Sequence, residues 1–128
     1  MPASSTRTHR LLVVEDDAEM RRLLVKALGA KEREVVDAAD GEEAIRLLDA
    51  GEPFDLVVSD IRMPNCDGND VLREIVQRHP GVKVVLITAF GDFEEYMESM
   101  ERGAFEYLTK PLKLVDLARA VNRALGSG

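Results

Sequence analysis

The sequence predicts an α/β fold in which helices cover both faces of one parallel sheet. Five short apolar runs alternate along the chain with five segments whose apolar residues recur at helical spacing. The runs are almost continuously apolar, which is typical of parallel strands buried on both faces. With 128 residues, the chain is long enough for one compact domain and its core. We therefore expect one domain over residues 10–126, preceded by a flexible polar tail over residues 1–9.

The expected strands share one pattern, an apolar run that ends in a polar or charged residue. The central example runs from Leu56 to Asp60, where two adjacent valines precede Ser59 and the aspartate. The complete set is residues 10–14, 34–38, 56–60, 83–87 and 105–108. Because ligands of open α/β sheets bind at the carboxyl ends of the strands, the residues that end these runs are the first candidates for a site.

A segment with helical spacing follows each strand. The first helix begins at Ala18 with Asp17 as its N-cap, and the last ends near Leu125. The others cover residues 42–50, 69–79 and 93–102, and the helix over residues 93–102 has the weakest apolar face. The residues expected to face the sheet are Met20, Leu23, Leu24, Ala27, Leu28, Ala44, Ile45, Leu47, Leu48, Val71, Leu72, Ile75, Val76, Tyr96, Met97, Met100, Leu114, Leu117, Ala118, Val121 and Leu125.

Strand order decides which strand ends meet. For five βα units, the flavodoxin-like order 2-1-3-4-5 is the natural choice, and it gives a (βα)5 three-layer sandwich. This order places the first and third strands side by side, so Glu15, Asp16 and Asp60 would meet at one edge of the sheet. Thr88 and Lys110, which follow the fourth and fifth strands, would flank them.

Composition restricts the classes of function. The net charge of −7 argues against direct binding of nucleic acid or of an anionic membrane by this domain. The single cysteine, Cys66, excludes an internal disulfide and a multi-cysteine metal site. No apolar run approaches the roughly 18 residues of a membrane span. The first ten residues contain no hydrophobic segment of the kind found in secretory signals, so we expect a cytoplasmic protein.

The predicted constellation suits phosphoryl transfer. Carboxylates brought into contact repel each other unless a cation or proton relieves them, and Mg²⁺ prefers oxygen ligands. Lys110 would supply a positive charge and Thr88 a hydroxyl beside Asp60, which could form an acyl phosphate. The two histidines, His9 and His79, lie in the tail and at a helix end, so no general base of the usual kind is expected nearby.

Four segments of the chain resemble the motifs of response-regulator receiver domains. They are residues 13–17, 59–64, 86–89 and 107–111, and the resemblance extends from about residue 10 to residue 125. It implies that Asp60 accepts a phosphoryl group from the phosphohistidine of a sensor histidine kinase. It also implies that Mg²⁺ is bound by Asp16, by Asp60, by the backbone carbonyl of Arg62 and, through water, by Glu15.

The resemblance further implies a switching mechanism. Thr88 turns toward the phosphoryl group, Lys110 pairs with that group, and Tyr107 changes rotamer as Thr88 moves. The surface of the fourth helix, fifth strand and fifth helix then passes the signal to an output domain or a partner protein, and a homodimer is left open. In this reading the chain is a phosphoacceptor that assists its own phosphorylation and dephosphorylation, and is not an enzyme.

Two further segments refine this resemblance. Residues 88–92 and 103–107 are similar to the receivers of enhancer-binding transcription activators, which suggests a role in transcription regulation. No output domain is present, so we expect a stand-alone receiver or a fragment of a longer regulator. Residues 65–70 depart from the usual receiver pattern, which leaves the start of the third helix open.

Three other functions are compatible with the predicted fold. A degenerate receiver would bind partners without phosphorylation, but Asp16, Asp60, Thr88 and Lys110 are all present. An aspartyl-phosphate hydrolase would usually carry a second aspartate where this chain has Arg62. A flavin-binding module would need a phosphate-binding loop rich in Ser, Thr and Gly after the first strand, where residues 15–17 are acidic.

Overall fold

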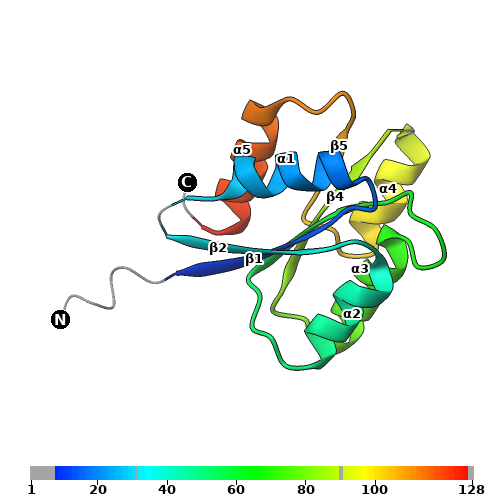
Figure 1. Ribbon diagram of the computed structural model, residues 1–128. Coiled ribbons are helices and arrows are strands. Elements are labelled where there is room, and N and C mark those ends of the chain that lie inside the picture. Colours follow the sequence, from blue (N-terminus) through cyan, green and yellow to red (C-terminus); the bar gives the residue numbers. More distant parts are fainter. Residues whose placement is uncertain (1–7, 31, 90, 127–128) are drawn as a thin grey trace.

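A computed structural model describes residues 8–30, 32–89 and 91–126 of the chain (Figure 1). Strands and helices alternate throughout the described residues, as the sequence predicts. The elements are β1 (His9–Val14), α1 (Ala18–Leu28), β2 (Arg33–Ala38), α2 (Gly41–Asp49), β3 (Leu56–Asp60), α3 (Gly68–Arg78), β4 (Lys83–Thr88), α4 (Phe93–Glu101), β5 (Glu106–Thr109) and α5 (Leu114–Ala124).

The sheet is parallel, and its order is β2-β1-β3-β4-β5, which confirms the predicted flavodoxin-like topology. The register brings the strand ends to one edge. Val14 lies beside Ser59, and Asp60 lies beside Ile87. Thr88 in turn lies beside Thr109, the last residue of β5. Residues that directly follow β1, β3, β4 and β5 are therefore neighbours in space.

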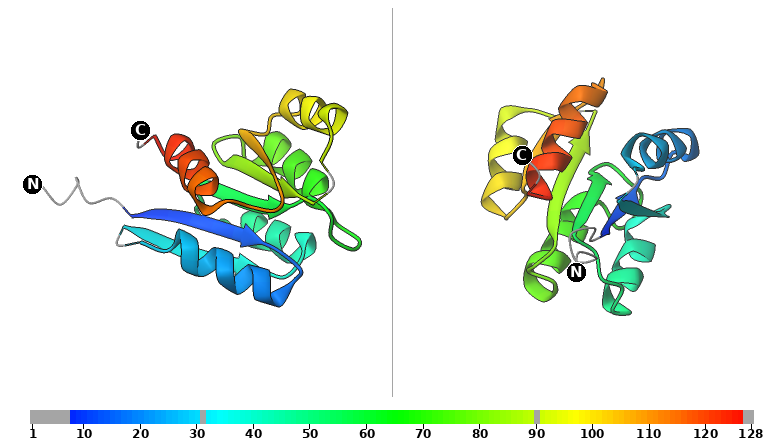
Figure 2. Two further views of the ribbon diagram at one scale, coloured as in Figure 1. Left: turned by 90° about the horizontal axis from the view of Figure 1, so that it is seen from above. Right: turned by 90° about the vertical axis from the view of Figure 1, so that its left-hand side faces the viewer.

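Helices form two layers around the sheet. In both Figure 1 and Figure 2, α1 and α5 lie on one face, and α2, α3 and α4 lie on the other. Each interface has its own apolar core, because alternate residues of the buried strands point to opposite faces. The buried core under α1 and α5 consists of Leu11, Val13, Leu24, Leu28, Leu56, Val58, Val85, Ile87, Leu117, Ala120, Val121 and Ala124. The core on the other face includes Leu12, Val14, Val57, Leu72, Ile75, Leu86 and Tyr107.

Aspartates cap four helices in the described part of the chain. Asp17, Asp40 and Asp92 each accept a hydrogen bond from a backbone N–H in the first turn of α1, α2 and α4, at 2.8 to 3.0 Å. At α3, Asp67 and Asp70 form a reciprocal capping box, with both bonds at 3.0 Å. Residues 65–70, which depart from the usual receiver pattern, therefore include an effective N-cap for α3, because Asp67 and Asp70 accept hydrogen bonds from N–H groups that would otherwise lack a partner.

Several predicted inner faces were too wide. Leu23, Val76 and Leu114 are 45 to 51% exposed, and Ala27 and Ala118 are also exposed. In α5, the buried positions are instead Leu117, Ala120, Val121 and Ala124. The physical reason is geometric: a helix lying on a sheet buries a narrow stripe, and residues at the margin of the apolar face reach solvent. Helical spacing alone does not locate the centre of that stripe.

Helix α4 departs most from its predicted face. Tyr96 and Met97 are 40 and 43% exposed, whereas Met100 is partly buried. Of the residues in α4, all of which are described, Ser99 is the one that is buried. The prediction that this helix has a weak apolar face agrees with that, although Tyr96 and Met97 lie at the exposed margin of the face and not in the core.

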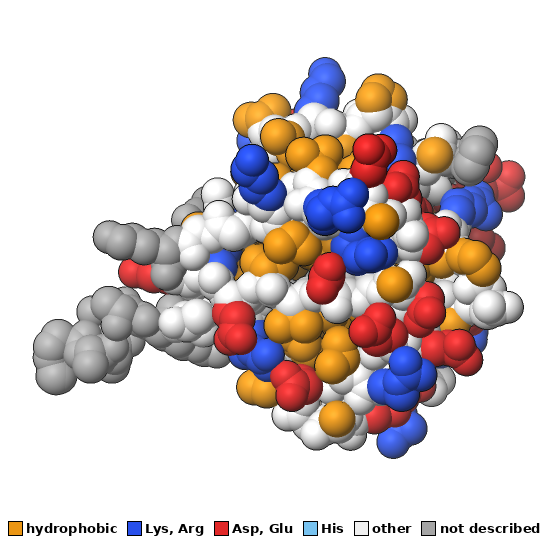
Figure 3. Space-filling model, in the orientation of Figure 1, with side chains coloured by type: hydrophobic (Ala, Val, Ile, Leu, Met, Phe, Trp, Pro, Cys, Tyr) orange, Lys and Arg blue, Asp and Glu red, His pale blue; other side chains and the backbone are white. Residues whose placement is uncertain are grey.

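Predicted boundaries differ from the observed ones by one or two residues. The first strand begins at His9 and not at Arg10, and the last strand covers Glu106–Thr109 in place of 105–108. Most of the predicted tail, together with Phe90 in the motif at 88–92, lies outside the described residues. No helix among the described residues is long and apolar enough to cross a membrane. Acidic and basic side chains are interspersed on the face shown in Figure 3.

Candidate functional site

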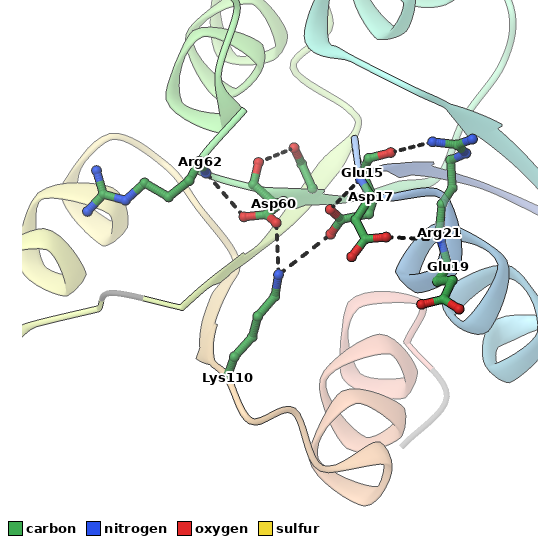
Figure 4. A network of polar contacts seen from close by, with 8 residues as sticks. Glu15, Asp17, Glu19, Arg21, Asp60, Arg62 and Lys110 are labelled. Atoms are coloured by element: carbon green, nitrogen blue, oxygen red, sulfur yellow. Dashed lines mark hydrogen bonds and ion pairs between the residues drawn. The ribbon is translucent and has the colours of Figure 1, made fainter. Parts of the chain in front are cut away.

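Glu15, Asp60 and Lys110 meet at the carboxyl edge of the sheet (Figure 4). Glu15 directly follows β1, Asp60 ends β3, and Lys110 directly follows β5. The adjacency of β1 and β3 in the sheet is what brings the two carboxylates together. Glu15 is 2% exposed and Asp60 is 6% exposed, so both acidic groups are largely removed from water. Buried carboxylates need compensating partners.

Both carboxylate oxygens of Asp60 accept hydrogen bonds. Oδ2 accepts from Lys110 Nζ at 2.9 Å, and Oδ1 accepts from the backbone N–H of Arg62 at 3.1 Å. The main chain of Asp60 is also packed tightly, because a Cβ on Gly68 would lie 2.5 Å from the Asp60 carbonyl oxygen. A residue without a side chain is required at position 68, and this holds the loop after β3 close to the aspartate.

Glu15 is held by its own loop as well as by the lysine. Its Oε2 accepts from the backbone N–H of Asp17 at 3.1 Å, and its Oε1 lies 3.7 Å from Lys110 Nζ. Arg21 donates to the Glu15 carbonyl at 2.8 Å. Burial raises the pKa of the Glu15 carboxyl to about 7, and the nearby Asp60 carboxylate adds to that shift. Without a cation, this carboxyl is therefore partly protonated near neutral pH.

Lys110 remains a cation in this setting. Burial acts to lower the pKa of its ammonium, but the hydrogen bond to Asp60 and the charges of Asp60, Glu15 and Asp16 outweigh burial and raise it. A charged ammonium at 2.9 Å from Asp60 stabilises the negative charge that the carboxylate already carries.

The carboxylates fit a divalent cation. One oxygen each from Glu15, Asp16 and Asp60 lies within 4.8 Å of the others. These three carboxylates against one ammonium leave a formal charge of −2 when all are ionised. Asp16 is exposed, unlike the other two, so the cluster is open to solvent on its side. An all-oxygen donor set with room for water suits Mg²⁺.

The other predicted residues of the site lie near this edge. Thr88 is fully buried at the end of β4, and Tyr107 is 9% exposed in β5. The Tyr107 hydroxyl donates to Glu95 Oε1 at 2.6 Å, and burial, followed by this bond, raises the pKa of the tyrosine. A Cβ on Gly91 would lie 2.6 Å from the Tyr107 hydroxyl oxygen and 3.0 Å from Thr88 Cγ2, so the absence of a side chain at position 91 lets both residues pack against the backbone of this loop.

Sequence reasoning missed three residues at this edge: Gly68, Gly91 and Glu95. The two glycines had a weak signal, since Gly68 begins α3 after the loop that follows β3, and Gly91 lies in the loop between β4 and α4. Glu95 had no signal of its own, because its partners Tyr107 and Arg62 lie 12 and 33 residues away in the chain.

A second group of possible ligands consists of Asp49, Glu74 and His79. His79 Nε2 lies 2.9 Å from Asp49 Oδ1, and this hydrogen bond is the main cause of the lowered pKa of Asp49. Arg78 Nη1 lies 3.3 Å from Glu74 and 4.0 Å from Asp49. The carboxylates are already paired with Arg78 and His79, so the group serves as a polar network between α2 and α3.

Comparison with protein families gives one match over most of the chain. Residues 11–122 match the model of the response regulator receiver domain. The response regulator protein PilR of Pseudomonas aeruginosa is 40% identical over 116 residues, which are 91% of this chain and 26% of PilR. The DNA-binding transcriptional regulator NtrC of Escherichia coli K12 is 36% identical over 113 residues, which are 88% of this chain and 24% of NtrC.

Solved structures agree with this match. A response regulator receiver domain protein from Clostridium thermocellum superposes with a TM-score of 0.85 at 33% identity, over 92% of this chain and 94% of that one. A CheY-like receiver domain protein from Methanospirillum hungatei gives 0.86 at 28% identity, over 93% and 94%. The chain spans about a quarter of the length of the curated relatives it matches.

Proposed function

This chain belongs to the response-regulator receiver family, and from that premise we propose that Asp60 is its phosphoacceptor. The observation that carries the proposal is the Asp60 carboxylate itself. It is 6% exposed, ends the central strand, and accepts from Lys110 at 2.9 Å. Its donor is the phosphohistidine of a sensor histidine kinase. Receiver domains are signalling phosphoacceptors and are not classed as enzymes.

Transfer requires one bond to form and one to break at phosphorus. An Asp60 carboxylate oxygen forms the new P–O bond while the P–N bond of the donor breaks, and the imidazole nitrogen keeps the electron pair. Lys110 and the backbone N–H of Arg62 orient the carboxylate through Oδ2 and Oδ1, and the ammonium would balance negative charge on the phosphoryl oxygens beside Asp60. This chain supplies position and charge for the transfer, and no separate general base is needed.

The acidic cluster supports a magnesium site at the same place. Asp16, Asp60 and the backbone carbonyl of Arg62 would hold Mg²⁺ directly, and Glu15 would hold it through water. When bound, Mg²⁺ neutralises charge on the transferring phosphoryl oxygens. Ionised Glu15 and Asp16 supply the negative charge that a divalent cation balances.

The switch proposal follows from the residues that flank Asp60. Thr88 would turn its hydroxyl toward the phosphoryl group, and Tyr107 would change rotamer as space near Thr88 changes. The surface formed by α4, β5 and α5 then changes its population between two arrangements. That surface carries exposed apolar side chains suited to contact with an output domain, a partner protein or a second copy of this chain, namely Phe93, Tyr96, Met97, Leu114 and Val115.

We place this receiver, over residues 10–126, in a transcription regulator of the cytoplasm. The support is similarity to PilR and NtrC, a response regulator and a DNA-binding regulator that are both much longer than this chain. Their additional length would hold the output function. The receiver itself is acidic, so contact with DNA would be made by another part of such a protein.

Intact mass after incubation with acetyl phosphate tests the phosphoacceptor. We expect one phosphoryl adduct that depends on Mg²⁺, is lost in Asp60→Asn, and persists in Asp37→Asn. Asp37 is a matched control, since it is a strand aspartate that is exposed and pairs with Arg21 outside the acidic cluster. An adduct that survives Asp60→Asn would refute the assignment. No adduct in a folded protein that binds Mg²⁺ would favour a degenerate receiver.

A further inference from the structure

The carboxylate of Glu95 joins three parts of the molecule. Glu95 lies in the first turn of α4, and its side chain is 17% exposed. Oε1 accepts from the Tyr107 hydroxyl of β5 at 2.6 Å, and Oε2 accepts from Arg62 Nη2 at 3.0 Å. Hydrogen bonds to an ionised acceptor are roughly twice as strong as neutral ones. These contacts of Glu95 with Tyr107 and Arg62 form the Glu95 junction.

Arg62 connects the junction to the phosphoacceptor. Its backbone N–H donates to Asp60 Oδ1 at 3.1 Å, while its side chain extends away from Asp60 toward α4 (Figure 4). One residue therefore contacts the acceptor carboxylate with its main chain and α4 with its guanidinium. A change in hydrogen bonding at Asp60 reaches Glu95 through a single residue.

Tyr107 connects the junction to the strand that carries the signal. Its ring is buried in the core and packs edge-on against Tyr96 of α4, with ring centroids 5.7 Å apart. A second rotamer of Tyr107 has to break the hydroxyl contact with Glu95, because that contact depends on the present position of the ring. The strength of this bond therefore opposes the rotamer change.

Helix α4 buries little of its own surface in the described part of the chain. Ser99 is its one buried residue, and Phe93, Tyr96 and Met97 are 40 to 74% exposed. Apolar burial holds such a helix weakly, so polar contacts at its first turn have a large share in its position. The two carboxylate oxygens of Glu95 make such contacts, one with Tyr107 and one with Arg62.

We propose that Glu95 is a positioning residue that stabilises the unphosphorylated arrangement of α4 and β5. Its carboxylate holds Tyr107 and the side chain of Arg62 together, and phosphorylation of Asp60 shifts the population by weakening this junction. This inference rests on the proposed function for its link to phosphorylation. The contact itself exists independently of that function.

Glu95→Gln tests the proposal, with Glu94→Gln as the matched control. Both glutamates lie in the first turn of α4, so both variants change the helix charge equally, but Glu94 is exposed. Without a phosphoryl donor, we expect Glu95→Gln to shift the Tyr107 ring resonances and the amides of β5, and Glu94→Gln to leave them in place. With acetyl phosphate, Glu95→Gln should be phosphorylated about tenfold faster, because the competent arrangement becomes more populated.

Tyr107→Phe provides an independent check, since it removes the hydroxyl and keeps the ring. Its effect on the phosphorylation rate should resemble that of Glu95→Gln, and the double variant should add little to either. Additive effects would mean that the two residues act separately and would overturn the junction. Far-UV circular dichroism of each variant establishes that the fold is retained.

The outcomes separate this inference from the proposed function. Equal spectra and equal rates for Glu95→Gln and Glu94→Gln, with a normal adduct at Asp60, would overturn the role of Glu95 alone. Slower phosphorylation of Glu95→Gln would also overturn it. Failure of Asp60 to accept a phosphoryl group would reject the proposed function, whereas the comparison of unphosphorylated spectra would still report whether Glu95 positions Tyr107.

Discussion

The carboxyl edge of the sheet has two halves, the ends of β1 and β3 and the adjoining helix α4, and different forces hold them in place. Every residue of β3 is buried, as are the last four residues of β1, so Asp60 and Glu15 project from the most tightly packed part of the sheet. Helix α4 lies at the same end of the molecule but buries Ser99 alone among its residues, and polar contacts of Glu95 attach it to Tyr107 and Arg62.

This difference matches two physical requirements. Phosphoryl transfer needs atoms held in place to a fraction of an ångström, which a close-packed core provides. A switch needs an element whose two positions differ by only a few kcal/mol, so that one added phosphoryl group can change their populations. Loose packing of β3 would prevent the precise positioning that transfer needs. Strong apolar packing of α4 would prevent the change of position that a switch needs.

Removal of the Lys110 side chain should uncouple the response of α4 and β5 from phosphorylation of Asp60. We expect Lys110→Ala to bind Mg²⁺ still, because the three carboxylates remain. The ammonium that lies 2.9 Å from Asp60 is lost, so most of the response of α4 and β5 to acetyl phosphate should disappear. Amide shifts measured with and without acetyl phosphate report this, with Lys113→Ala as an exposed control. An unchanged response in Lys110→Ala would contradict the role given to this lysine.

Truncation of a side chain should lower the free energy of unfolding much more in β3 than in α4. Leu56 in β3 is fully buried, so Leu56→Ala should lower the free energy of unfolding by about 2–5 kcal/mol. Met97 in α4 is 43% exposed, so Met97→Ala should cost less than about 1 kcal/mol. Urea denaturation of the two variants measures both values. Similar losses would mean that α4 is packed as firmly as the sheet.

Stability without metal should depend on the ionisation of Glu15. Its pKa in the folded protein, about 7, lies above its usual value of 4.5, so the folded state binds this proton more tightly than the unfolded state does. The contribution is present in full below pH 4.5 and is lost as pH rises toward and through 7. A shift of this size corresponds to at most about 3 kcal/mol.

Urea denaturation in EDTA at several pH values measures this dependence. Glu15→Gln should flatten the profile between pH 4.5 and 7, and the exposed control Glu101→Gln should leave it unchanged. Added Mg²⁺ should reduce the loss at neutral pH, since a cation favours the ionised carboxyl. A wild-type profile that is already flat in EDTA would contradict the buried, partly protonated Glu15.

Substitution of Gly68 and Gly91 by alanine should show how much extra volume the structure tolerates near β3 and near α4. In Gly68→Ala, the new Cβ would meet backbone atoms of Asp60 and Ile61 at 2.5 and 2.8 Å, and overpacking of this kind costs about 1–3 kcal/mol. In Gly91→Ala, it would meet the ends of the Tyr107 and Thr109 side chains, which can move. We expect a smaller loss there, together with a shift of the Tyr107 ring resonances.

Gly81→Ala is the control for both glycine variants, because no described heavy atom lies within 4 Å of a Cβ built there. Its unfolding free energy should change by less than about 0.5 kcal/mol. A larger loss in Gly91→Ala than in Gly68→Ala would reverse the comparison between the two halves.

Local patterns were sufficient to predict the architecture and the edge of the sheet at which the proposed site residues lie. Apolar runs that end in Glu15, Asp60, Thr88 and Lys110 indicated parallel strands whose ends share one edge, and the observed order β2-β1-β3-β4-β5 brings them there. The prediction of the strands was possible because the apolar residues that bury a strand and the polar residue that ends it are consecutive in the sequence. The resemblance to receiver domains was likewise carried by short segments, and the family match confirms it.

Contacts between distant segments were decided by the tertiary structure alone. Helical spacing did not show that Leu23, Val76 and Leu114 lie at the exposed margin of their helices, because the centre of the buried stripe depends on how each helix sits on the sheet. Nor could any local pattern join Glu95 to Arg62, 33 residues earlier, and to Tyr107, 12 residues later. A carboxylate acquires such partners only when the chain has folded, since their positions are set by β3 and β5 and not by the helix that carries it.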